Sequence, residues 1–288
     1  MQTLSEIRAL LAERNLRPKR RFGQHFLHDK NLLRKLVAEA RIEPGDVVLE
    51  VGPGTGSLTE ALLDRGAEVV ACEIDRGLAA IIIERFGGRV CVIQGDCLSG
   101  TRALNLDVAE ALGNRPFRLV SNLPFQVAAT LVMVLLVHYP QCHGQFVTVQ
   151  KEVADRLMAE PGTKAFGPLA VIVGALAEIR QVALLKPSCF WPQPEVDSAM
   201  CALRRRVDHA LKDPAALAAF AGVIFRSRRK QLGRILGRRF SDWPAGVTPE
   251  TRPEALAVGQ VIELWRNAGG WATPEVVRAK PKERPKGR

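Results

Sequence analysis

Four residues of the N-terminal half are of the types that hold a nucleotide-like cofactor. Gly52 and Gly54 belong to the run Glu50–Gly56, where the main chain can approach a ligand because no Cβ is in the way. The carboxylate of Glu73 could accept hydrogen bonds from both ribose hydroxyls of an adenosyl group. Asp96 could accept a hydrogen bond from the adenine amino group. Together they predict a site for an adenosyl cofactor.

The spacing of these groups favours S-adenosylmethionine over a dinucleotide. The dinucleotide fingerprint requires a glycine where this chain has Ser57. Glu73 and Asp96 are placed to end the second and third predicted strands, and open α/β sheets bind ligands at the carboxyl ends of their strands. We therefore expect S-adenosylmethionine as the cofactor. We expect no metal, because the histidines lack metal-ligand spacing.

A second motif, Asn122-Leu123-Pro124-Phe125, follows the fourth predicted strand and suits an adenine substrate. The exocyclic amine of adenine is a poor nucleophile, since its lone pair is delocalised into the ring. The side-chain carbonyl of Asn122 and the main-chain carbonyl of Leu123 could accept its two hydrogens and direct the lone pair. Pro124 would supply a rigid turn, and Phe125 an apolar face on which an extruded base stacks.

The elements that must position these motifs alternate between strand and helix. Apolar runs predict strands over 47–51, 68–72, 90–93, 117–121 and 145–149, with helices over 5–14, 30–40, 57–65 and 78–86. This alternation predicts a parallel sheet covered on both faces. The C-terminal part instead predicts helices over 214–225, 227–236 and 252–267. We expect a catalytic domain over 1–204, a small helical domain over 205–273 and a basic disordered tail over 274–288.

Positive charge is concentrated in three segments of a chain whose net charge is +11. Residues 1–35 hold nine Lys or Arg against three acids, residues 204–240 hold eleven against two, and residues 276–288 hold six against one. Separate basic segments around an acidic body favour a nucleic-acid partner over a merely solvated surface. The apolar run 127–137 is too short to span a bilayer, and scattered cysteines favour a cytoplasmic protein without disulfides.

The sequence resembles the KsgA-type ribosomal RNA adenine N6,N6-dimethyltransferases over nearly its whole length. The resemblance is carried by segments 21–27, 50–56, 122–125, 150–156, 164–169, 186–198 and 225–232. It implies a Rossmann-like methyltransferase sheet with a small all-helical C-terminal domain. It also implies dimethylation of two adjacent adenines near the 3' end of small-subunit (16S) rRNA, on the immature subunit and by a monomer.

Carried over position by position, the resemblance implies two sets of site residues. Those expected at the cofactor are His25, Leu27, Gly52, Gly54, Glu73, Asp96 and Asn122. Those expected at the target base are Asn122, Leu123, Pro124 and Phe125, with Phe190 as a second stacking face. His25 stands where Asn is more usual, so either a ring nitrogen or the main chain of His25 could contact the cofactor. Phe125 stands where Tyr is more usual, and this change keeps a ring on which a base can stack.

A basic helix is expected to bind RNA through Arg226, Arg228, Arg229 and Lys230. Two other functions are compatible with the same features. One is a large-subunit rRNA adenine methyltransferase of the macrolide-resistance type. The other is a non-catalytic RNA-binding assembly or transcription factor on the same fold, which could keep the basic segments while losing cofactor groups. The presence of Gly52, Glu73, Asp96 and Asn122 favours an active enzyme.

Overall fold

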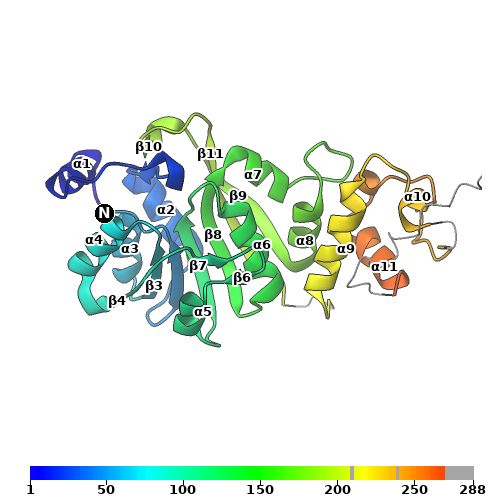
Figure 1. The fold of residues 1–288 in the computed structure, drawn as a ribbon, viewed down its shortest axis with the longest axis horizontal. Coiled ribbons are helices and arrows are strands. Elements are labelled where there is room, and N and C mark those ends of the chain that lie inside the picture. Colours follow the sequence, from blue (N-terminus) through cyan, green and yellow to red (C-terminus); the bar gives the residue numbers. More distant parts are fainter. Residues whose placement is uncertain (208–210, 238–239, 270–288) are drawn as a thin grey trace, which may run out of the picture. The chain divides into compact units, whose positions relative to one another are not determined.

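The computed structural model describes residues 1–207, 211–237 and 240–269 (Figure 1). These residues form two compact units. The first takes 1–158 and 176–207, and the second takes 159–175 and the described residues from 211 onward. The predicted tail over 274–288 lies outside the described residues. Within them, no helix is both long and apolar enough to cross a membrane.

A seven-stranded sheet forms the centre of the first unit, in the order β4-β3-β2-β7-β8-β11-β9. The strands are β2 (Val47–Val51), β3 (Glu68–Glu73), β4 (Val90–Gln94), β7 (Phe117–Asn122), β8 (Cys142–Gln150), β9 (Ala177–Leu185) and β11 (Ser198–Arg205). β2 is buried along its whole length, as its mainly apolar sequence predicts. The five strands predicted from the sequence all form, and their mutual pairings are parallel.

The parallel strands predicted from the sequence are joined at one edge by two further strands, β11 and β9. β11 pairs antiparallel with both β8 and β9, so the sheet is mixed. β9 is buried only at its two ends, Ala177 and Leu185, and its other positions are exposed or partly buried, so it lacks the continuous apolar run that predicts a strand. An antiparallel edge on a mainly parallel sheet is common among α/β folds.

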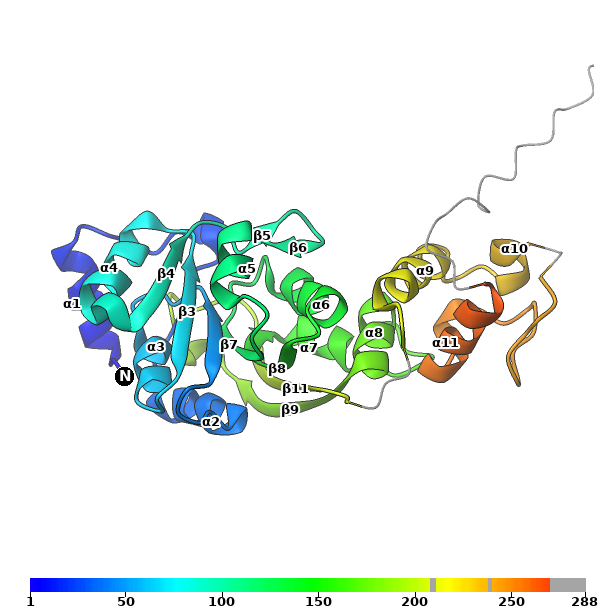
Figure 2. The ribbon, with the colours of Figure 1, turned by 90° about the horizontal axis from the view of Figure 1, so that it is seen from below.

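Helices cover both faces of this sheet (Figure 2). α2 (Lys30–Ala40), α3 (Ser57–Leu63) and α4 (Arg76–Phe86) share one apolar cluster with the strands, Phe146 of β8 included. α6 (Ala128–His138) covers the other face, where the neighbouring Gln145 donates its Nε2 to the carbonyl of Val132. The remaining helices of this unit are α1 (Leu4–Glu13), α5 (Leu106–Leu112) and α7 (Lys151–Leu157), with 3-10 turns η1 (Arg20–Phe22), η2 (Gly87–Arg89) and η3 (Pro187–Cys189).

Two short ladders join segments outside the main sheet. β1 (Phe26–Leu27) pairs antiparallel with β10 (Phe190–Trp191), which opposes Phe26 to Trp191 and Leu27 to Phe190. β5 (Leu98–Ser99) pairs with β6 (Ala103–Leu104). The first ladder fixes the N-terminal segment against a part of the chain more than 160 residues away. It thereby helps to form the wall of the site described below.

The second unit is helical, with α8 (Pro168–Leu176), α9 (Pro214–Arg226), α10 (Leu232–Leu236), η4 (Pro253–Ala255) and α11 (Val258–Asn267). It differs from the expected domain 205–273 by including 159–175. The reason is apolar packing. The ring of Phe166 meets that of Phe225 edge-on at 5.6 Å, and Gly174 lies against Val258 so closely that an added Cβ would be 3.0 Å from its Cγ2.

The helix predicted over 227–236 was too long. α9 ends at Arg226, a turn follows, and α10 begins only at Leu232. Tertiary hydrogen bonds explain the interruption, because Leu232 donates its main-chain N–H to Thr251 at 2.8 Å and Gly233 donates to Pro249 at 2.8 Å. The basic residues Arg228, Arg229 and Lys230 therefore lie on a turn, not on a helix.

Candidate active site

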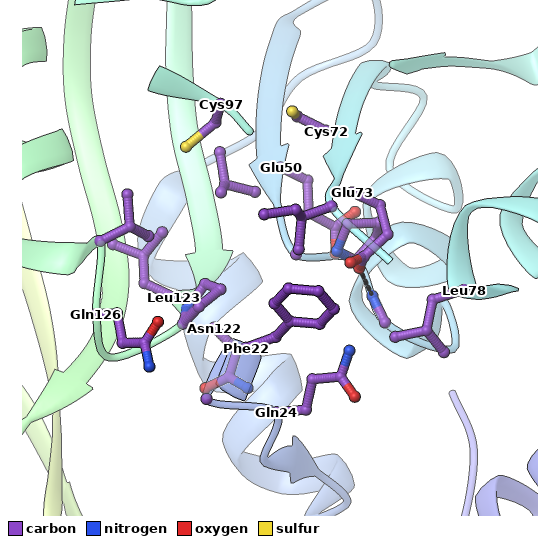
Figure 3. Close-up of a pocket in the computed structure, with 18 of the residues that line it drawn as sticks. Phe22, Gln24, Glu50, Cys72, Glu73, Leu78, Cys97, Asn122, Leu123 and Gln126 are labelled. Carbon is purple, nitrogen blue, oxygen red and sulfur yellow. Dashed lines mark hydrogen bonds between the residues drawn. The ribbon is translucent and has the colours of Figure 1, made fainter. Parts of the chain in front are cut away.

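A cavity of about 390 Å³ opens at the carboxyl ends of β2, β3, β4 and β7 in the first unit (Figure 3). Its lining comes from the glycine-rich turn after β2, the loops after β3, β4 and β7, and the N-terminal segment 22–27. The volume lies within the usual range for a small-molecule site. The topology thus brings together the groups that the sequence placed at successive strand ends.

The glycine-rich turn needs its glycines for both conformation and space. Gly52 and Gly54 have positive φ angles of 73° and 61°, which side chains rarely adopt. An added Cβ on Gly54 would lie 2.9 Å from the ring of Phe26, and one on Gly52 would lie 3.0 Å from Cγ of Pro124. The turn is therefore held between the N-terminal segment and the loop after β7, and its main chain faces the cavity.

Glu73 ends β3 with its carboxylate oriented by two main-chain N–H groups. Gly54 donates to its Oε2 at 3.2 Å and Asp75 donates to its Oε1 at 2.9 Å. The side chain is 3 % exposed, and this burial raises its pKa. A carboxylate accepts about four hydrogen bonds, so each oxygen keeps acceptor capacity toward the cavity, which Glu73 lines.

Asp96 follows β4 and also lines the cavity, with an exposed side chain. Its Oδ1 accepts a hydrogen bond of 3.0 Å from the main-chain N–H of Leu98, which fixes the carboxylate at the start of the β5–β6 ladder. Two thiols line the same region. Burial raises the pKa of Cys72 to about 12 and raises that of Cys97 as well, so both are neutral, compact apolar groups.

Asn122 is the last residue of β7, and its side-chain amide is held in one orientation. Its Nδ2 donates a hydrogen bond of 2.9 Å to the main-chain carbonyl of His25. Its Oδ1 is buried and has no hydrogen-bond partner among the described residues. The next main-chain N–H, that of Leu123, donates to Thr148 at 3.1 Å and ties the loop to β8. A buried acceptor without a partner is costly, so a ligand group that donates to it is the natural complement.

Phe125 and His25 lie against each other at the cavity wall. Their ring centroids are 5.2 Å apart and the ring planes differ by 27°. The imidazole Nδ1 lies 2.7 Å from the carbonyl oxygen of Pro192. The Nδ1 atom of His25 therefore points toward the main chain of Pro192. The main-chain carbonyl of His25 accepts the hydrogen bond from Asn122.

Phe190 lies outside this cavity, contrary to its predicted role as a second stacking face. Its side chain is 1 % exposed and belongs to an apolar cluster with Leu27 and Met200. Residues opposed in a strand ladder share a face, so pairing with Leu27 directs Phe190 into the core. Leu27 itself is buried at the cavity wall, as is Phe26 beside it.

The motif 21–27 forms the N-terminal wall of the cavity, and it contributes three residues that were not individually predicted at the cofactor. Phe22, Gly23 and Gln24 all line the cavity. Asp75 anchors this segment, because its Oδ2 accepts from Gln24 Nε2 at 3.2 Å and pairs with Lys19 Nζ at 2.8 Å. Its Oδ1 meanwhile caps α4 through the N–H of Gly77.

Glu50 is a third acidic residue in the lining of the cavity, and no role for it was predicted from the sequence. It lines the cavity with 1 % of its surface exposed and accepts a hydrogen bond of 2.7 Å from the hydroxyl of Thr59. Burial raises its pKa to about 8. Its position inside an apolar strand could have indicated a role, because an acid that is buried in such a strand needs a specific partner.

The four basic residues proposed for RNA are in the second unit. Arg226, Arg229 and Lys230 are exposed. Arg228 differs, because its Nη1 donates to the carbonyl of Lys164 at 2.7 Å and its Nε lies 3.7 Å from a carboxylate oxygen of Glu254. Its guanidinium therefore has internal partners within the unit.

Comparison with known proteins gives a consistent result. The sequence matches the family described as ribosomal RNA adenine dimethylase over residues 15–267. It is 38 % identical over 289 residues to the ribosomal RNA small subunit methyltransferase A of Cutibacterium acnes, covering 92 % of this chain and 94 % of the relative.

Two solved structures share the fold. One is a dimethyladenosine transferase from Plasmodium falciparum, with a TM-score of 0.68, 23 % identity, and coverage of 85 % of this chain and 98 % of that one. The other is the 23S rRNA methyltransferase ErmE, with a TM-score of 0.65, 25 % identity, and coverage of 85 % and 99 %. The Rossmann-like methyltransferase architecture expected from the sequence is thereby confirmed.

Proposed function

Because this chain belongs to the ribosomal RNA adenine dimethylase family, we propose that it dimethylates the N6 atoms of two adjacent adenines near the 3' end of small-subunit (16S) rRNA. The relative from Cutibacterium acnes is named for the small ribosomal subunit, which supports this choice of RNA. The substrate would be the immature small subunit, and the enzyme would act as a cytoplasmic monomer.

The observation that carries the proposal is the unpartnered Oδ1 of Asn122. The other polar atom of the same amide, Nδ2, donates to the carbonyl of His25, whereas Oδ1 has no partner among the described residues. Rotating the amide by 180° would break the bond to His25 and place two oxygens against each other. An adenine amine donates hydrogens and would fill this acceptor. In the first transfer the carbonyl of Leu123 would accept the second hydrogen, so that the nitrogen is drawn toward a tetrahedral geometry with its lone pair free. The nitrogen releases one proton to solvent with each methyl group that it gains, so in the second transfer one hydrogen is left for Oδ1 of Asn122. Asn122 would thus act most strongly near the transition state.

The cavity residues fit S-adenosylmethionine as the cofactor. Glu73 offers oriented carboxylate oxygens to ribose hydroxyls, Asp96 offers an acceptor to the adenine amine, and the turn at Gly52 and Gly54 admits a close ligand. His25 and Leu27 complete the wall on the N-terminal side. When bound, the cofactor supplies a methyl group made electrophilic by its sulfonium. No metal is included in this proposal.

The remaining groups hold the target base and the RNA. Pro124 packs against Gly52 and shapes the loop, while the half-buried ring of Phe125 offers a stacking face. Arg226, Arg229 and Lys230 would contact phosphates from the second unit. We include Arg228 in this surface as well, although its internal partners give it a second role in that unit.

The large-subunit alternative has one observation in its favour, the structural likeness to ErmE at 25 % identity. The small-subunit relative is more similar, with 38 % identity over nearly the whole chain. A non-catalytic role is disfavoured because Glu73, Asp96 and Asn122 are retained and all line one cavity.

The test is methyl transfer in vitro. The purified chain would be incubated with S-adenosylmethionine and either immature small subunits or large-subunit rRNA from a strain lacking both methyltransferases. Mass spectrometry should then find N6,N6-dimethyladenosine at two neighbouring positions of the small-subunit RNA. Modification of large-subunit RNA alone would favour the alternative, and no modification of either RNA would contradict the proposal.

A further inference from the structure

His25 is attached to the protein through both its side chain and its main chain. The imidazole Nδ1 lies 2.7 Å from the carbonyl oxygen of Pro192. A carbonyl oxygen only accepts, so Nδ1 must carry the hydrogen in this contact. The ring is thus locked in one orientation at the cavity wall, which His25 lines.

In this orientation the imidazole covers one face of the Phe125 ring. The centroid separation of 5.2 Å and the angle of 27° describe two rings in stacking contact. At this separation a third ring cannot enter between them. A base that stacks on Phe125 must therefore use the opposite face, unless the imidazole first leaves.

We propose that His25 is a positioning residue for the target adenine, acting through Phe125. By occupying one face, the imidazole fixes the tilt of the Phe125 ring and leaves a single face for the base. This inference rests on the proposed function and deepens it. Phe190, which is buried in the core, takes no part in this arrangement.

The same residue orients the other group that meets the base. Its main-chain carbonyl accepts the hydrogen bond from Asn122 Nδ2, so the imidazole and the carbonyl of one residue set the positions of Phe125 and Asn122 respectively. A side-chain substitution at His25 removes the stacking contact and keeps the carbonyl. The contribution of the ring can therefore be measured separately from that of Asn122.

A double-mutant cycle tests the proposal. Single-turnover methyl transfer to immature small subunits would be measured at saturating cofactor for wild type, His25→Ala, Phe125→Ala and the double variant. We expect His25→Ala to be slower by roughly two- to tenfold, the worth of one aromatic pair. If His25 acts through Phe125, the double variant should be no slower than Phe125→Ala. Calorimetry of the four proteins with S-adenosylmethionine measures any loss of cofactor binding by itself, and the saturating cofactor keeps such a loss out of the transfer rate.

Two further variants separate the ring from its hydrogen bond. His25→Phe keeps a stacking ring without the donor, and His25→Asn keeps a donor without the ring. We expect His25→Phe to retain most of the rate and His25→Asn to fall with His25→Ala. The opposite order would overturn the proposal, since it would assign the effect to the contact with Pro192.

The proposal would also be overturned if the rate loss of the double variant equalled the product of the losses of the two single variants. A His25→Ala variant whose only defect is weaker cofactor binding would overturn it as well. These results differ from a failure of the proposed function. A wild-type chain that leaves small-subunit RNA unmethylated contradicts the function and this inference with it. Independent effects of His25 and Phe125 in an active wild type contradict the inference alone.

Discussion

Asn122 and His25, which are 97 residues apart in sequence, are joined by a hydrogen bond of 2.9 Å from the Asn122 side-chain amide to the His25 carbonyl. The bond couples the end of β7 to the N-terminal wall of the cavity. One consequence is that the wall facing the cofactor and the groups facing the base form one connected structure. Substitutions in this region should therefore be designed to change one contact at a time.

The first prediction concerns Glu73 and the cofactor. Glu73→Ala should weaken the binding of S-adenosylmethionine by roughly 1–3 kcal/mol, the usual worth of lost charge-assisted hydrogen bonds. Isothermal calorimetry measures this directly. Glu68→Ala is a matched control, because Glu68 begins the same strand, is exposed and pairs with Arg115 away from the cavity. Equal affinities for the two variants would remove Glu73 from the cofactor site.

The second prediction concerns Glu50 and the pH dependence of stability. Burial raises its pKa from 4.5 to about 8, so the folded chain keeps a proton that the unfolded chain releases. Between these pH values the unfolded state binds fewer protons, and the free energy of unfolding falls as the pH rises. The slope for this group is at most about 1.4 kcal/mol per pH unit.

Glu50→Gln should flatten this loss, because the amide keeps a polar group without an ionisation. Urea unfolding of the cofactor-free protein at pH values from 5 to 8.5 gives the comparison. We expect wild type to lose stability relative to Glu50→Gln as the pH increases through this window. Parallel curves for the two proteins would show that Glu50 is already ionised in the folded state.

Much of the frame of the site could be predicted from local sequence. The strand predicted over 47–51 forms as Val47–Val51, and the helix predicted over 30–40 forms as Lys30–Ala40, where the side chain of Asp29 caps its first turn. Glu73, Asp96 and Asn122 line one cavity, because the alternation of strands and helices makes the strands parallel and so places their carboxyl ends at the same edge of the sheet.

What the sequence did not predict depends on contacts between distant segments. The side chain of Phe190 is directed into the core by the short ladder in which it pairs with Leu27, and no local sequence pattern predicts this pairing. The partners of His25, namely Pro192 and Asn122, lie 167 and 97 residues away. The turn after Arg226 likewise follows from hydrogen bonds to Pro249 and Thr251, which override the helical propensity of the basic run.

The third prediction concerns the exposed basic residues of the second unit. Arg226→Gln, Arg229→Gln and Lys230→Gln together should weaken RNA binding and make the plot of log affinity against log salt shallower by about 2–3. Arg115→Gln in the first unit is the control, because that guanidinium is paired with Glu68. An unchanged slope in the triple variant would assign these side chains to another role.

Arg228 is kept out of this triple variant because of its internal contacts. Loss of its bonds to Lys164 and Glu254 should lower the stability of the second unit in addition to any loss of phosphate contact. Thermal unfolding of Arg228→Gln beside the triple variant separates the two effects. A variant that is as stable as wild type would show that these internal contacts are not important for stability.

The fourth prediction concerns Phe125 as the stacking face. Phe125→Ala should slow single-turnover methyl transfer by an amount equivalent to about 1–3 kcal/mol, the usual worth of base–aromatic stacking. Phe125→Tyr keeps the ring and should stay active. Overall RNA affinity should change little in both, because phosphate contacts dominate it. A normal rate in Phe125→Ala would place the base on another surface.

The last prediction concerns Asn122 and is the most direct test of the site. Asn122→Ala removes the acceptor for the adenine amine, an interaction that is strongest near the transition state. We therefore expect single-turnover transfer to fall by roughly 10- to 100-fold, with little change in RNA affinity. Asn31→Ala, which removes an exposed amide on α2, is the control for the loss of a side-chain amide elsewhere.

Asn122→Asp adds a second comparison at the same position. It keeps an acceptor oxygen but loses the Nδ2–H that His25 accepts, and it turns a carboxylate oxygen toward that carbonyl. Repulsion between the two oxygens should misplace the side chain, so this variant should also be slow. A nearly wild-type rate of methyl transfer by Asn122→Ala would show that other groups hold the amine. Oδ1 of Asn122 would then not be the acceptor for its hydrogen.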